Sequence, residues 1–191
     1  MYDIFTSRNV LTRFLALWTA GFTCMYIAWS ISYRALPDGV LCGKFLVNQV
    51  QIVTQELLST FSRILTYNLF LACVPLVLAN LVRVKGIPLG YMLASYHWVL
   101  YGMLLGTNSF IMPSPSRLLP SIGILFYGIG IYEITAYTLI AAATCSITVY
   151  FGGNISDVKI GGLLRGEKII LAISFGLLAA SNFIEAWQIV N

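Results

Sequence analysis

Uncharged stretches of about 20 apolar residues recur along the chain, and this is the length that an α-helix needs to cross a bilayer. The first stretch, residues 14–33, lies between Arg13 and Arg34, with a tryptophan near each end, as at a membrane interface. The pattern predicts an all-α bundle of five membrane-spanning helices, with residues 1–191 as a single domain. We place the spans at residues 14–33, 64–82, 88–107, 121–149 and 169–190.

Between the first two spans, residues 45–63 show a different pattern. Apolar side chains recur there at helical spacing, and amides and other polar groups fill the remaining positions. This is typical of an amphipathic helix that lies on the membrane surface or packs on a partner. No glycine or proline separates it from the second span, so the two can form one helix that bends near Thr66–Asn68. Pro75 predicts a further kink.

The third and fourth spans carry signals of capping and of breaks. Pro88 is expected in the first turn of the third span, where its missing N–H costs nothing. The proline-rich residues 108–116 predict a turn at the membrane surface or a shallow re-entrant piece. The fourth span, 121–149, is about two turns longer than a bilayer requires, so we expect it to be tilted, or broken near Gly128 and Gly130.

Composition agrees with a membrane protein. The mean hydropathy is +0.85, and 59% of the residues are hydrophobic whereas only 9% are charged. Soluble domains carry roughly 25% charged residues, so a water-soluble globular protein is excluded. Disorder is excluded as well, because it needs low hydrophobicity. The basic residues form no stripe, which argues against nucleic acid and leaves the lipid bilayer as the expected partner.

The distribution of basic residues predicts the orientation. Five spans place the two termini on opposite sides of the membrane. With the N-terminus inside, seven of the 11 basic residues lie on the inner side and four on the outer side. The positive-inside rule therefore predicts a multi-pass protein of the cell membrane with a cytoplasmic N-terminus and an outer C-terminus. The outer residues are Arg34, Lys44, Arg63 and Arg117.

The chain shows no signature of a cofactor, a metal site or an enzyme. It has one histidine and four cysteines without a C-x-x-C pair, so neither haem nor a metal cluster is expected. It lacks G-x-S-x-G, H-E-x-x-H and a phosphate-binding glycine loop. We therefore predict a protein that is not an enzyme and has no cofactor.

Ionisable residues inside the spans are the candidates for function. Glu133 lies near the middle of the fourth span, where an ionised acid costs about 2.5–3.5 kcal/mol on insertion scales. It is either a proton or cation site or a buried acid that hydrogen-bonds neighbouring helices. Glu185 either reaches the interface or faces the bundle interior together with Asn182, three residues earlier. His97 either pairs with Glu133 as a relay or is satisfied by a neighbouring helix.

Small residues mark a candidate helix-packing face. Gly102 and Gly106 form a G-x-x-x-G motif in the third span, and Gly90 and Ala94 extend it. Such faces allow close helix approach. We expect packing within the chain first and an oligomer contact second, with Gly130 as a further packing position.

Four short motifs lie at the starts of the second and third spans and within the fourth and fifth. They are residues 67–69 (YNL), 86–90 (GIPLG), 130–136 (GIYEITA) and 179–186 (AASNFIEA). With the order of elements over roughly residues 45–187, they resemble the stage II sporulation protein M family of small membrane proteins. That family opens its second span with an asparagine, which corresponds to Asn68. It carries P-H-G-x-x-E-L-P-A in the fourth span, and Glu133 corresponds to its acid.

The chain departs from this signature at three positions. Ile129 stands at the histidine, and Gly128 and Thr135 stand at the two prolines. The resemblance implies a membrane scaffold or complex subunit rather than a defined activity.

Two functions are therefore expected. The first is a non-enzymatic subunit that scaffolds or anchors a multi-protein membrane complex, with other membrane subunits or copies of itself as partners. The alternative is a small transporter or ion-translocating subunit that uses Glu133.

Overall fold

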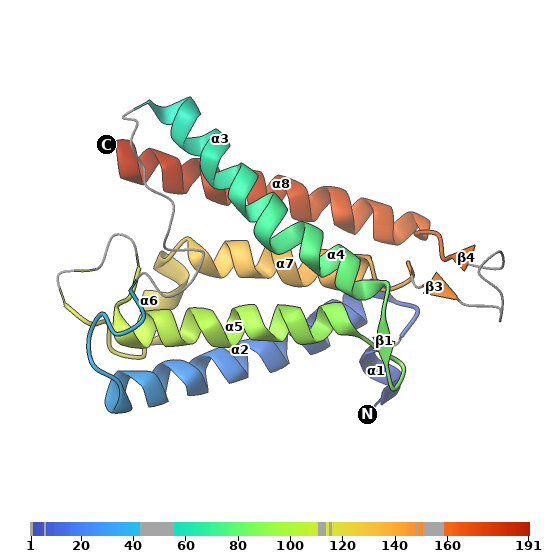
Figure 1. Cartoon of the computed structure of the whole chain (residues 1–191), viewed down its shortest axis with the longest axis horizontal. Helices are drawn as coiled ribbons and strands as arrows, with labels where there is room; N and C mark the ends of the chain where they lie inside the picture. The colour runs from blue at the N-terminus through green and yellow to red at the C-terminus, as the bar shows by residue number, and fades with distance from the viewer. Residues whose placement is uncertain are drawn as a thin grey trace.

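The computed structural model describes residues 2–5, 7–42, 56–110, 114, 116–147, 149–150 and 159–191 (Figure 1). Most of these residues are helical, which confirms the all-α class. Within the described residues, the strands are two hairpins of two-residue strands.

The chain begins with a short helix, α1 (Tyr2–Phe5), and a long one, α2 (Val10–Ala35). The side chain of Asn9 caps α2, because its Oδ1 accepts the N–H of Leu11 at 2.9 Å. The helix starts four residues before the predicted span at 14–33. Arg13 therefore lies in the first turn of α2, and its side chain is buried.

One continuous helix contains α3 (Leu57–Tyr67), the π-helical segment η2 (Asn68–Cys73) and α4 (Val74–Asn80). In η2 the N–H of Val74 donates to the carbonyl of Leu69, five residues back. Pro75 follows directly and has no N–H to donate. The irregularity thus begins at Asn68, next to the expected bend, and helix 57–80 replaces the predicted span at 64–82.

Only part of the predicted amphipathic helix over 45–63 can be compared with the structure. Residues 45–55 lie outside the described residues. Glu56 has an extended backbone (φ −91°, ψ 124°) and precedes α3. An unbroken helix through Glu56 is therefore wrong, because helical geometry starts only at Leu57.

A tight hairpin leads into the next helix. Strands β1 (Arg83–Val84) and β2 (Ile87–Pro88) pair antiparallel. The two turn residues, Lys85 and Gly86, both have positive φ (50° and 83°), as the two-residue turn that matches strand twist requires. Helix α5 (Leu89–Thr107) follows. Pro88 precedes this helix as its N-cap instead of occupying its first turn.

The fourth predicted span is broken, as its length suggested. Helix α6 (Ile122–Tyr127) is separated from α7 (Gly130–Ala143) by Gly128 and Ile129. The extension of this span to residue 149 is wrong. The helix stops at Ala143, and β3 (Val149–Tyr150) pairs with β4 (Lys159–Ile160) beyond it. Helix α8 (Arg165–Val190) completes the fold.

The long helices alternate in direction, so the two termini lie at opposite ends of the bundle (Figure 1). Helices α2 and α5 form one layer, and helix 57–80 and α8 form the other. Helix α7 lies between them, in contact with α2, α4, α5 and α8. The core contains large apolar side chains that are almost fully buried. They include Met25, Trp29, Leu76, Trp98, Ile140 and Leu178.

The G-x-x-x-G face packs within the chain. A Cβ on Gly102 would overlap the carbonyl of Met25, and a Cβ on Gly106 would overlap Ser32. Both neighbours belong to α2, so the absence of side chains is what allows α2 and α5 to touch. Gly130 likewise lies under the ring of Tyr101. All three glycines therefore allow close packing between helices of the same chain.

Three helices of the described chain are long and apolar enough to cross a membrane: α2, helix 57–80 and α8. Helix α5 has 19 residues and α7 only 14, and neither belongs to this set. The protein is therefore a helical membrane protein with three candidate spans among the described residues, and these residues do not support the predicted number of five.

Candidate functional site

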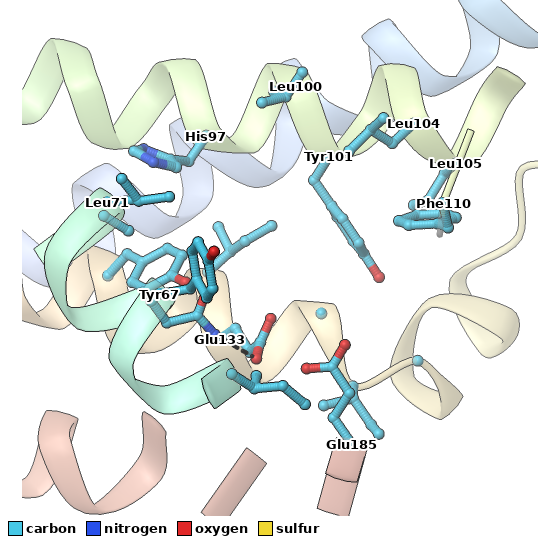
Figure 2. A pocket seen from close by; sticks show the side chains of 18 of the residues that line it. Tyr67, Leu71, His97, Leu100, Tyr101, Leu104, Leu105, Phe110, Glu133 and Glu185 are labelled. Carbon is cyan, nitrogen blue, oxygen red and sulfur yellow. Dashed lines mark hydrogen bonds between the residues drawn. The ribbon is translucent and has the colours of Figure 1, made fainter. Parts of the chain in front are cut away.

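A cavity of about 560 Å³ lies among α3, η2, α5, α7 and α8 (Figure 2). It is located in the half of the bundle that holds the end of α5 and the end of α8. Apolar and aromatic side chains make up most of its lining. The polar groups that line it are Tyr67, Asn68, His97, Tyr101, Ser114, Glu133, Tyr137, Glu185 and Gln188.

Asn68 connects three helices at the edge of this cavity. Its Nδ2 donates to Oε1 of Glu133 at 3.1 Å and to Oδ1 of Asn182 at 2.9 Å. Asn68 is the first residue of η2, Glu133 lies in the first turn of α7, and Asn182 lies in α8. The π-helical geometry therefore starts at the residue that joins the acid to α8, and π segments are frequent at functional sites.

Glu133 and Glu185 face the same space. Figure 2 shows both carboxyl groups extending into the cavity, from α7 and α8 respectively. The two groups are close enough to interact directly. Two adjacent carboxylates repel each other, and a single proton shared between them removes that repulsion. The pair can therefore hold one proton, or one cation in its place.

The lining supplies no positive side chain to neutralise this pair. Among the described residues around the cavity there is neither lysine nor arginine. The neighbours of Glu133 are an amide, Asn68, and the second acid. A proton or a bound cation can supply the compensating charge.

His97 lines the same cavity from α5. Its Nδ1 lies 2.7 Å from the carbonyl oxygen of Leu93. Because a carbonyl only accepts, Nδ1 carries the hydrogen, which leaves the Nε2 lone pair for another partner. The ring packs against Tyr137, with centroids 5.4 Å apart. The structure thus places His97 near the acids without a direct bond to Glu133.

The structure brings the four candidate polar residues to one place. Asn68, His97, Glu133 and Glu185 come from four different segments, and each lines the cavity. Glu185 faces the bundle interior with Asn182, as one of the two alternatives for it expected. The roles of these residues remain predictions.

Sequence reasoning missed a further acid, which is buried. Glu167 is 1% exposed and pairs with Arg13 at 2.5 Å. Arg13 also donates to the carbonyl of Ala142 at 2.9 Å and to that of Ser7 at 2.8 Å. One signal was available: Glu167 falls in the first turn of α8, where acids are favoured. Its partner in α2, 154 positions away, left no local pattern.

Comparison with known proteins gives no further guidance, since no family model, no curated protein and no solved structure matches the chain.

Proposed function

We propose that this protein is a small transporter or ion-translocating subunit, in which the Glu133–Glu185 pair takes up a proton or a cation. The observation that carries the proposal is a cavity of about 560 Å³ that two interacting carboxyl groups line and no described lysine or arginine neutralises. Ionisable groups inside membrane bundles commonly mark ion and proton pathways.

The scaffold function has less support from the geometry. Its sequence argument used the small-residue faces, and Gly102 and Gly106 are covered by α2 of the same chain. A second argument was the amphipathic segment, which lies mostly outside the described residues, and a third was the absence of catalytic motifs from the sequence. The resemblance to the sporulation protein M family therefore stays a prediction, and so does a role as a complex subunit.

We further propose five spans: α2, helix 57–80, α5, the broken α6–α7 unit and α8. Helix α5 rises about 28 Å over its 19 residues, close to the thickness of a bilayer core. About half of its residues are buried, including Trp98 and Leu104. A span that other helices shield from lipid does not need a uniformly apolar sequence.

The orientation of the termini tests this topology. In a variant whose four cysteines are replaced by serine or alanine, a new cysteine at Ser7 or at Asn191, which follows α8, is labelled with a membrane-impermeant maleimide in intact cells. Five spans in the cell membrane with an inner N-terminus predict labelling at position 191 and not at position 7. Labelling of both positions, or of neither, would mean an even number of spans.

The transport function is tested in liposomes. Purified protein is reconstituted with a pH-sensitive dye inside, and a cation gradient or a membrane potential drives flux. We expect Glu133→Gln to reduce flux at least tenfold, because the amide cannot take up or release a proton. Tyr132→Phe, at the exposed neighbouring position, is the control and should leave flux unchanged. Full flux in Glu133→Gln would refute the proposal.

A further inference from the structure

The composition of the cavity indicates which class of cation it accepts. A bare metal ion prefers about six or more oxygen ligands and a small site. In the described residues, no group of three or more histidine, cysteine, aspartate or glutamate side chains could hold a metal ion. The cavity instead offers two carboxyl groups and a wall that is mostly apolar and aromatic, with neutral polar side chains among it. A volume of about 560 Å³ lies in the range of organic ligands, about 300–1,000 Å³.

Aromatic side chains occupy the wall next to the acids. Tyr67 comes from α3, Tyr101 from α5 and Tyr137 from α7, and Phe110 packs against Tyr101 with ring centroids 5.9 Å apart. Figure 2 shows Tyr101 extending from α5 toward the space above Glu185. Aromatic faces attract organic ammonium ions, and the effect grows when water is excluded.

We infer that the occupant of this cavity is an organic ammonium ion with an apolar body. Its nitrogen lies between Glu133 and Glu185, and its apolar part fills the space lined by Leu71, Leu100 and Leu104. This inference rests on the proposed function and narrows it from any cation to an amphipathic one. A doubly charged anion has no place in the cavity, because none of its described lining residues is a lysine or an arginine.

Binding of such an ion exchanges it for the shared proton. The cation enters with one positive charge, and the proton held between the two carboxyl groups leaves, so charge is balanced. Other titratable side chains face or lie near the pair. They are Tyr67 and Cys73 from helix 57–80, His97 and Tyr101 from α5, and Tyr137 from α7. Of these side chains, only an unperturbed histidine titrates near neutral pH. The experiment must therefore show that the released proton does not come from His97.

The test measures binding to the purified full-length protein by calorimetry, with three probes of the same charge. We expect benzyltriethylammonium to bind at least tenfold tighter than tetramethylammonium, and sodium to show no binding. One proton should be released per bound ion, both in the unmodified protein and in His97→Gln. Glu133→Gln should weaken binding at least tenfold.

A matched pair of tyrosines tests the aromatic wall. Tyr67 lines the cavity, whereas Tyr96 in α5 does not, and the two are similarly exposed at 38% and 49%. Tyr67→Leu should weaken benzyltriethylammonium binding about two- to fivefold, as the loss of one cation–π contact implies. Tyr96→Leu should not change it. Equal effects of both variants would overturn the assignment of the wall.

The outcomes separate this inference from the proposed function. Tight binding of sodium without binding of the organic ions would overturn the organic ligand class and leave cation transport standing. Absence of binding by all three ions, with no proton flux in liposomes, would overturn both. Nanodiscs of phosphatidylglycerol with and without phosphatidylethanolamine distinguish two sources of the ammonium group. Competition by phosphatidylethanolamine would assign it to a lipid headgroup, and its absence to a free amine.

Discussion

The bundle contains two interior acidic sites, one at each end, and they differ in what surrounds the carboxyl groups. At the end near the N-terminus, Glu167 forms an ion pair with Arg13. Each of the two charged side chains also forms a hydrogen bond with the backbone at a helix end. Arg13 binds the carbonyl of Ala142 at the C-terminus of α7, and Glu167 accepts the N–H of Leu164 at the N-terminus of α8. At the other end, Glu133 meets Glu185 and an open volume.

This difference separates a structural acid from a functional one. Around Glu167 a cation, a backbone N–H and the hydroxyl of Ser146 occupy the carboxyl oxygens, so no ligand is needed. Around Glu133 the described residues provide an amide and a second acid, and none of those lining the cavity is a lysine or an arginine. The sites also differ in exposure, since Glu167 is buried whereas Glu133 and Glu185 are half-buried beside the cavity. The partner of each acid and the free volume next to it complete the distinction.

The largest expected effect is the loss of the Arg13–Glu167 pair. Arg13→Met leaves a buried carboxylate without its cation, and breaking such a pair costs about 3–5 kcal/mol of folding free energy. The measurement is reversible unfolding in mixed micelles. The double variant Arg13→Met, Glu167→Met should recover much of this loss, because no lone charge remains. If Arg13→Met unfolds like the unmodified protein, the pair has no structural role.

A smaller loss is expected where α2 meets α5. Gly102→Ala places a methyl group against the carbonyl of Met25, and such overpacking typically costs about 1–3 kcal/mol. Gly176→Ala in α8 is the matched control, because nothing lies within 4 Å of a Cβ there. It should be neutral or slightly stabilising, since alanine favours a helix more than glycine does. Equal stability of the two variants would argue against close packing through Gly102.

The smallest effect on stability is expected at the cavity. Glu133→Gln keeps the shape of the side chain and an oxygen that can accept from Asn68. We expect the free energy of unfolding to change by less than about 1 kcal/mol, a difference typical of sites without a buried ion pair. The same variant should lose transport. Large destabilisation without loss of flux would instead place Glu133 with Glu167, among the structural acids.

The predictions from sequence were most reliable where the evidence is local. Runs of apolar residues located the long helices to within a few residues at most ends. Of the two alternatives expected for the long fourth span, a tilt or a break near Gly128 and Gly130, the structure shows the break. The end of α7 at Ala143 was missed, because the apolar sequence continues to residue 149 without a helix signal that stops it. Hydropathy reports burial and cannot distinguish a helix from a hairpin that follows it.

For the candidate site, too, sequence reasoning identified single residues but not the contacts between them. An acid in the middle of an apolar segment stands out in any sequence, so Glu133 and Glu185 were found as single residues. That Asn68 binds Glu133, or that His97 lies across from it, depends on how four segments pack.

Composition and periodicity alone identify a helical membrane protein and the ionisable residues inside its predicted spans. The reason is that the free energy of moving a residue from water into the membrane is set mainly by its own side chain. Only the tertiary structure decided which acid pairs with a cationic side chain and which acids line a cavity. Arg13 and Glu167 are 154 positions apart, and Asn68 and Glu133 are 65 apart. Contacts at such separations are set by helix packing, and the packing at small residues such as Gly102 determines which side chains meet.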